Sequence, residues 1–285
     1  MRKFFRLLWR LISAPFRPFF RFFLNLYYFF SIEPEDAPIP EAIAKTIQQP
    51  RGLLEHLTVL RKHLFYALIA LVITTGTAFA YLEDLVAWLT KPIGGIQSLQ
   101  AIEVTEPLGV AMRVVLLAGF AAALPYIAFE FYLFAAPGLT VRGRIRGLLA
   151  LPLVTIFFLA GMAFAYYVML PAALPFLIHF LGIPAAIRPA SYIRFTTGLM
   201  FWIGVAFQFP LVIYALAAMG LVKARMLAEQ WRLAVVLIAV LAAAITPTID
   251  PINMALVMGP MIVLYFLSIG LAYLAQGGRA RNTTD

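Results

Sequence analysis

The chain has 285 residues, of which 63% are hydrophobic and only 12% are charged. A water-soluble domain normally carries about twice that share of charged residues, so much of the apolar surface must face lipid and a pair of soluble domains is excluded. The chain has no cysteine, which excludes disulfide and thiol chemistry, and with only three scattered histidines no metal or other cofactor is expected.

The first 31 residues form a basic amphipathic segment. On a helical wheel its cations share an arc of roughly 100°, and aromatic and leucine residues fill the rest. Such a segment is expected to lie in the inner-leaflet interface, with membrane lipids as partners. A cleaved signal peptide is the alternative, but dispersed arginines and the lack of a small-residue cleavage site argue against it. Residues 32–50, which include EPEDAPIP, are expected to form a polar, proline-rich linker.

Apolar runs long enough to cross a bilayer follow at 64–82, 107–136, 148–177 and 192–221. Residues 231–276 are too long for one crossing and carry TPTIDP at their middle, so two short helices in a hairpin are expected there. Prolines within or near the spans are expected to kink them. These prolines are Pro125, Pro171, Pro175, Pro210 and Pro260.

The expected fold is an all-α polytopic membrane domain over residues 51–276 with six transmembrane helices, followed by a tail at 277–285. Eighteen of the 22 Lys and Arg residues fall on one side of these six crossings. The positive-inside rule therefore predicts that both termini are cytoplasmic. Because the positive charge flanks apolar runs, the net charge of +9 does not indicate nucleic acid as a partner.

Five short stretches in the chain stand in a characteristic order and spacing. They are EHLTVLRKHL at 55–64, TEPL at 105–108 with Arg113 behind it, Pro125 with Phe134 and PGL at 137–139, FQFP at 207–210, and ITP at 245–247 with Asp250. Together they resemble the twin-arginine translocase subunit TatC, over about residues 52–276. FQFP lies where that family has an FE-x-P motif, and ITP with Asp250 is similar to its TPPD turn.

The resemblance implies a receptor rather than an enzyme. The family's fold is a six-helix bundle shaped like a cupped hand, with both termini in the cytoplasm. It recognises folded precursors by an Arg-Arg motif in their signal peptides, and the proton-motive force drives transport. The implied partners are TatA- and TatB-type single-span subunits, and a homo-oligomer within the complex is expected.

A signal-peptide site is expected at the cytoplasmic face. The residues expected to form it are Glu55, His56, Leu60, Arg61, Lys62, Phe134, Pro137, Leu139 and Arg144. Carboxylates bind arginine in a bidentate fork, but two acidic residues usual in the family are replaced here by Val59 and Gly143. Glu55, with backbone carbonyls near 137–140, is therefore expected to accept the arginines. Pairing of Glu55 with Lys62, or a helix cap, is the alternative.

Several of these residues also fit a structural role. Arg61 could orient a carboxylate or anchor the helix at the headgroups. Leu60 lies on one apolar stripe with Leu57 and Leu64, which is typical of packing. His56 is expected to form a hydrogen bond rather than to act as a pH switch.

Glu130 is the most costly residue of the second span, because a charge in hydrocarbon costs at least about 2.5–3.5 kcal/mol. The family commonly has Gln at this position and Glu in the fourth span, where this chain has Gln208. We expect these exchanged side chains to share one polar pocket on the concave face. The alternative is that Glu130 lies at the cytoplasmic rim.

On the outer side, Arg113 is expected to pair with Glu103 or Glu106, next to Pro107, and to brace the outer loop. Asp250 before a proline has the form of a helix N-cap.

Other functions remain open at this point. A secondary transporter or channel for small solutes is one alternative, although no internal repeat is evident. An intramembrane enzyme lacks support, because the sequence has no HExxH or GxSxG motif. A degenerate TatC-like subunit is the third, since Val59, Gly143 and Phe266 replace acidic residues.

Overall fold

The computed structural model describes residues 50–281, except for 139–140, 179–185 and 247–250. The predicted leader and nearly all of the predicted linker lie outside the described residues, as does the end of the tail. Within the described ranges the regular elements are helices, and the one β contact is an isolated bridge between Leu99 and Ile187.

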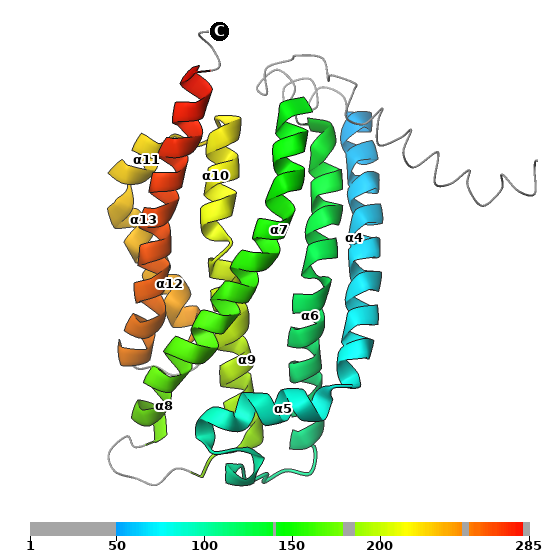
Figure 1. Cartoon of the computed structure of the whole chain (residues 1–285), viewed down its shortest axis with the longest axis vertical. Coiled ribbons are helices and arrows are strands. Elements are labelled where there is room, and N and C mark those ends of the chain that lie inside the picture. Colours follow the sequence, from blue (N-terminus) through cyan, green and yellow to red (C-terminus); the bar gives the residue numbers. More distant parts are fainter. Residues whose placement is uncertain (1–49, 139–140, 179–185, 247–250, 282–285) are drawn as a thin grey trace, which may run out of the picture. The chain divides into compact units, whose positions relative to one another are not determined.

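Figure 1 shows the helices in chain order. They are α4 (Pro50–Phe79), α5 (Leu82–Thr90), α6 (Glu106–Ala135), α7 (Val141–Phe164), α8 (Leu170–Ile178), α9 (Pro189–Ala206), α10 (Phe209–Met219), α11 (Ala224–Glu229), α12 (Trp231–Ile245) and α13 (Pro251–Arg281). A π-helical segment at Ala165–Met169 joins α7 to α8, and short 3₁₀ turns occur at Lys91–Ile93, Ile96–Ser98 and Ala136–Gly138.

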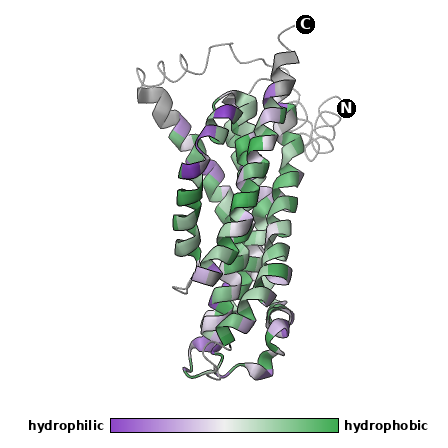
Figure 2. Ribbon diagram, turned by 90° about the vertical axis from the view of Figure 1, so that its left-hand side faces the viewer, coloured by the Kyte–Doolittle hydropathy of each residue, from purple (hydrophilic) through white to green (hydrophobic). Residues whose placement is uncertain are grey.

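Five helical stretches are long and apolar enough to cross a membrane, and the apolar helix α12 is a shorter sixth segment of 15 residues. The five are His56–Phe79, Glu106–Ala135, Gly143–Ile178, Pro189–Met219 and Asn253–Gln276. The predicted all-α polytopic fold with its six apolar segments is confirmed. Figure 2 shows that hydrophobic residues cover most of the length of these helices.

Two short helices were predicted at the C-terminal end, and this prediction is correct only for the first of them. Helix α12 is short, but α13 has 31 residues and continues into the predicted tail. Pro260 lies inside α13 without ending it. A proline removes one backbone hydrogen bond, but α13 packs along α10, α11 and α12, and this packing holds the helix together.

Proline ends a helix elsewhere in the chain. The fourth span consists of α9 and α10, which are separated at Phe207 and Gln208, and Pro210 stands in the first turn of α10. Pro125 and Pro175 lie inside helices, as predicted, and so does Pro152 in α7, which was not among the predicted prolines.

The chain divides into two compact units, which are described separately. The first comprises the residues up to Ala67 together with Ile127–Leu151, and the second comprises Leu68–Tyr126 with Pro152–Asp285. The second unit has the larger hydrophobic core. Its fully buried side chains include Val114, Phe158, Met169, Ile193 and Ile203.

Candidate functional site

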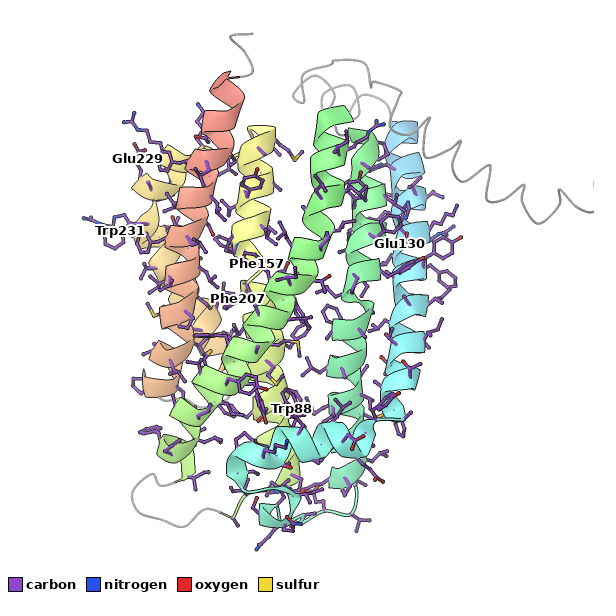
Figure 3. The ribbon with its side chains drawn as sticks, in the orientation of Figure 1. Trp88, Glu130, Phe157, Phe207, Glu229 and Trp231 are labelled. Carbon is purple, nitrogen blue, oxygen red and sulfur yellow. The ribbon has the colours of Figure 1, made fainter. Side chains whose placement is uncertain are left out.

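Glu130 and His63 form a buried pair in the first unit. The Glu130 side chain extends from α6 (Figure 3) and is 6% exposed, and that of His63 in α4 is 19% exposed. Nδ1 of His63 lies 2.6 Å from Oε2 of Glu130. The pair meets the requirement that a carboxyl group in an apolar helix have a polar partner. It also joins α4 to α6.

A small hollow adjoins this pair between α4 and α6. Apart from Glu130 and His63, its walls are apolar. They are formed by Leu60, Leu64, Ala67, Phe131 and Phe134. Two of these residues, Leu60 and Phe134, were predicted from sequence to belong to the signal-peptide site.

A ring contact joins the same two helices. The ring centroids of His56 and Phe134 are 4.4 Å apart, with the planes tilted by 31°. Both residues were predicted to belong to the site, and the structure brings them together. His63 lies seven residues after His56, or about two helical turns, so both imidazoles are on one face of α4.

The predicted cations of α4 lie on the exposed side of that helix. Arg61 and Lys62 are both exposed. The Nζ atom of Lys62 lies 6.0 Å from the centroid of the Tyr66 ring, at the outer limit of a cation–π contact. The side chain of Glu55 and the whole of Leu139 lie outside the described residues, and Pro137 is exposed in the 3₁₀ turn after α6.

Arg144 has a structural contact. Its side chain is buried and its Nε donates a 3.0 Å hydrogen bond to the carbonyl oxygen of Ala136. The Tyr132 hydroxyl donates to the carbonyl oxygen of Arg144 at 2.8 Å. These two bonds tie the end of α6 to the start of α7, so a direct contact between Arg144 and a signal peptide stays a prediction.

Gln208 has a partner different from that of Glu130. Its Nε2 donates to the carbonyl oxygen of Val154 at 3.1 Å, in the second unit. The contact lies at the break between α9 and α10 and binds that break to α7. The polar pocket predicted to be shared by Glu130 and Gln208 stays a prediction.

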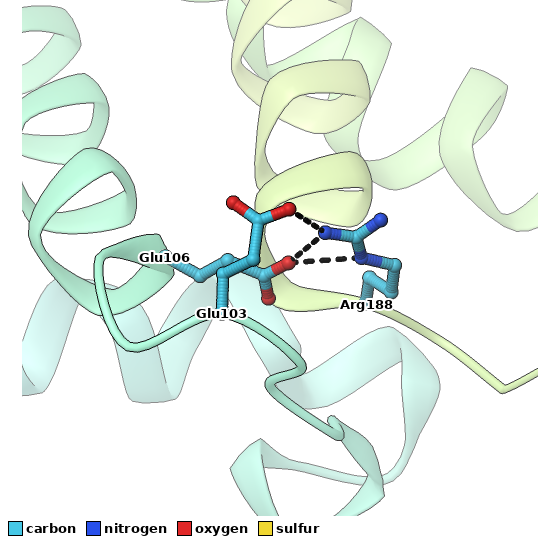
Figure 4. A network of polar contacts seen from close by, with 3 residues as sticks. All are labelled: Glu103, Glu106 and Arg188. Atoms are coloured by element: carbon cyan, nitrogen blue, oxygen red, sulfur yellow. Dashed lines mark hydrogen bonds and ion pairs between the residues drawn. The ribbon is translucent and has the colours of Figure 1, made fainter.

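The carboxylates of Glu103 and Glu106 are bound by Arg188, not by Arg113 as the sequence analysis expected (Figure 4). Arg188 Nε donates to Oε1 of Glu106 at 2.8 Å, and its Nη2 contacts both Glu106 and, at 3.0 Å, Glu103. The hydrogen bonds to Glu106, and then those to Glu103, raise the pKa of Arg188 above its ordinary value.

The wrong prediction for Arg113 has a simple geometric cause. Arg113 lies seven residues after Glu106 in α6, which is roughly 10 Å along the helix axis, and it is exposed. Arg188 directly precedes α9, level with the first turn of α6. Pro107 occupies the second position of α6. Asp250 lies outside the described residues, but α13 begins at Pro251, where the sequence predicted a helix start.

Residues 55–260 match the family model of TatC, the Sec-independent protein translocase protein. The chain belongs to the TatC family. A TatC protein of Koribacter versatilis is 31% identical over 258 residues, which cover 88% of this chain and 95% of that protein. TatC of a Synechocystis species is 34% identical over 223 residues, covering 77% and 87%. The resemblance drawn from the five sequence motifs is confirmed.

Solved structures agree with this assignment. A crystal structure of the twin-arginine translocase receptor TatC aligns with a TM-score of 0.68 and 31% identity, over 78% of this chain and 99% of the other. A second, in the detergent DDM, aligns with a TM-score of 0.70 and 30% identity, over 76% and 99%. This chain therefore has the TatC fold as well as the TatC sequence pattern.

Sequence analysis missed two functional candidates, His63 and Arg188. His63 follows His56 at a spacing of seven residues, and this periodicity was a signal that both rings lie on one face. Arg188 precedes a proline that starts a helix, but its pairing with residues 82 and 85 positions away has no local sequence signal.

Proposed function

We propose that the chain is the signal-peptide receptor and core subunit of a twin-arginine translocation system, which exports folded proteins with the proton-motive force. Membership of the TatC family carries this proposal. The contact of His56 with Phe134 supports it further, because two residues of the expected recognition site meet between α4 and α6.

The proposed complex includes TatA- and TatB-type single-span subunits and several copies of this chain. The proposed location is the cell inner membrane, with both termini in the cytoplasm. Eighteen of 22 Lys and Arg residues on one side of the crossings support this orientation. Reporter fusions at the two ends test it, because one end outside and one inside would contradict the even number of crossings.

The proposed recognition surface consists of the 55–64 segment and the C-terminal end of α6. Glu55, Arg61, Lys62 and the carbonyl groups at 137–140 supply its polar groups in this proposal. Arg144 would support the surface by holding the turn after α6. The membrane leader at 1–31 would keep this surface close to anionic lipid.

Complementation tests the whole proposal. A bacterial strain whose own TatC protein has been deleted is given this chain together with its cognate partner proteins, and export of a folded reporter with a twin-arginine signal is measured. We expect export with the Arg-Arg signal and none with a Lys-Lys signal. Membrane insertion without export would favour the degenerate TatC-like protein, for which the replacement of acidic groups by Val59, Gly143 and Phe266 is the specific observation.

A further inference from the structure

We propose that Glu130 is the carboxylate that accepts a guanidinium group of the twin-arginine motif, and that His63 occupies it in the absence of a signal peptide. This inference rests on the proposed receptor function and names a binding residue for it. Glu130 would supply in α6 the acidic group that the 55–64 segment lacks at Val59 and the following loop lacks at Gly143.

The sequence leaves few other acceptors near this surface. Glu55 is the one acidic residue in 50–82, and Glu130 is the one acidic residue in 127–151. A guanidinium group binds a carboxylate with two parallel N–H bonds, which a backbone carbonyl does not match. Selection of arginine over lysine therefore requires a carboxylate such as Glu130.

The hollow beside Glu130 has the chemistry that an arginine side chain requires. Phe134 lies one helical turn after Glu130, on the same face of α6. Leu60 and Phe134 line the hollow that contains Glu130. The methylene stem of an arginine can pack on these apolar walls while its charged group reaches the Glu130 carboxylate.

His63 is the polar partner of the Glu130 carboxylate when no peptide is bound. An unpaired buried carboxylate is strongly destabilising, and the 2.6 Å contact with Nδ1 of His63 supplies a partner. A guanidinium fork offers more donors than one imidazole nitrogen does. The His63 side chain is already 19% exposed, so it has access to solvent when the arginine replaces it.

The neighbouring cations do not compete with an arginine for the Glu130 carboxylate. On a helical wheel Arg61 and Lys62 lie roughly 160° and 100° away from His63, and both are exposed. Their charges therefore face away from the carboxylate. Arg144, the described cation of the following turn, is bonded to the Ala136 carbonyl.

The experiment measures binding of labelled Arg-Arg and Lys-Lys signal peptides to the full chain in lipid nanodiscs. We expect Glu130→Gln to weaken Arg-Arg binding roughly tenfold or more, with a much smaller effect on the Lys-Lys peptide. We expect His63→Leu to leave Arg-Arg binding equal or stronger, because the competing partner is removed. Glu229→Gln, which breaks the exposed pair with Arg225 on α11, is the matched control and should change nothing.

Two results would overturn the inference. Equal weakening by Glu130→Gln and His63→Leu would show that the pair only holds α4 against α6. Unchanged Arg-Arg binding by Glu130→Gln would remove Glu130 from the site while the receptor function stands. A wild-type chain that binds neither peptide would instead contradict the proposed function itself.

A second measurement guards against loss of folding. Because the chain has no cysteine, Leu60→Cys provides a single thiol at the hollow. With an added oxidant such as copper phenanthroline, which takes up the two electrons, a peptide with a cysteine beside its Arg-Arg motif should form a disulfide with this thiol, and the yield should fall at least severalfold when Glu130→Gln is added. An undiminished yield contradicts the inference, and thermal unfolding of each variant confirms that it is folded.

Discussion

The Thr74 hydroxyl of α4 donates a hydrogen bond of 2.8 Å to the carbonyl oxygen of Gly119 in α6. This bond is possible because the two backbones are in direct contact. A Cβ atom at Gly119 would lie 2.6 Å from Cα and 2.8 Å from the backbone nitrogen of Thr75. Small residues allow such close approaches between membrane helices, where packing rather than the hydrophobic effect drives association.

Gly119→Ala is therefore expected to separate the two helices. The added methyl group meets backbone atoms, which have no alternative rotamer to adopt, so we expect a loss of roughly 1–3 kcal/mol in the free energy of unfolding. Unfolding in mixed detergent micelles measures the change. Gly109→Ala is the matched control in the same helix, because its Cβ would meet no atom within 4 Å.

The control is expected to leave stability unchanged or raise it by up to about 1 kcal/mol, since alanine favours helix over glycine. A Gly119→Ala protein as stable as the Gly109→Ala protein would contradict the close contact.

A second close contact involves two glycines, Gly161 in α7 and Gly204 in α9. Substitution of each by alanine is expected to lower stability to a different extent. A Cβ at Gly161 would lie 2.8 Å from Cα of Gly204 and 2.9 Å from the carbonyl oxygen of Ile203, whereas the atoms nearest to a Cβ at Gly204 belong to the Phe158 ring, the first of them at 2.7 Å. A ring moves more readily than backbone. Gly161→Ala should therefore lower the free energy of unfolding by about 1–3 kcal/mol, and Gly204→Ala should lower it by less.

Gly198→Ala is the control for this pair, because Gly198 is also in α9 and its Cβ would have open space. Thermal unfolding of the three variants in one detergent gives the ranking. An equal or reversed effect of the two contact glycines would show that Phe158, which is almost fully buried, is the less yielding neighbour.

Local sequence properties were sufficient to predict the fold class. They did not predict the contacts between segments that are distant in the sequence. Apolar runs and charge bias are read from neighbouring residues, so the six apolar segments were found from sequence. The length of α13 was missed because the helix continues to Arg281, beyond residue 276 where the apolar run used to predict it ends. The pairing of His63 with Glu130 was missed because it depends on which helices are neighbours, which hydropathy does not encode.

The carboxylates bound by Arg188 should differ in their effect on stability. Glu106 is 3% exposed and shares two contacts with Arg188, whereas Glu103 is 64% exposed and has one. We expect Glu106→Ala to lower the melting temperature clearly and Glu103→Ala to have little effect, because exposed ion pairs contribute little.

Arg188→Gln should resemble Glu106→Ala, while Arg113→Gln, at an exposed position of the same helix as Glu106, should leave the melting temperature unchanged. The raised pKa of Arg188 means that its contribution is lost only as the pH rises above the ordinary arginine range, so the difference between wild type and Arg188→Gln should persist from pH 6 to pH 9. A melting temperature lowered more by Arg113→Gln than by Arg188→Gln would restore the pairing first expected from sequence.

Two tyrosines hold the C-terminal end of α5. The hydroxyl of Tyr192 in α9 donates to the carbonyl oxygen of Leu89 at 2.7 Å, and that of Tyr166 in the π-helical segment donates to the carbonyl oxygen of Trp88 at 2.6 Å. The Tyr166 ring also stacks on Trp88, with centroids 4.0 Å apart. The position of α5 therefore depends on hydroxyl groups from two later segments of the chain.

Tyr192→Phe and Tyr166→Phe remove these donors and keep the rings. Each is expected to cost about 0.5–1.5 kcal/mol and to speed amide exchange across α5, as measured by mass spectrometry. The double variant should lose less free energy of unfolding than the sum of the two single losses. Both bonds hold the same end of α5, and that end is released only once. Tyr167→Phe is the control, since Tyr167 is 65% exposed. Amide exchange in α5 that is no faster in the double variant than in Tyr167→Phe would mean that α5 is held by its apolar contacts alone.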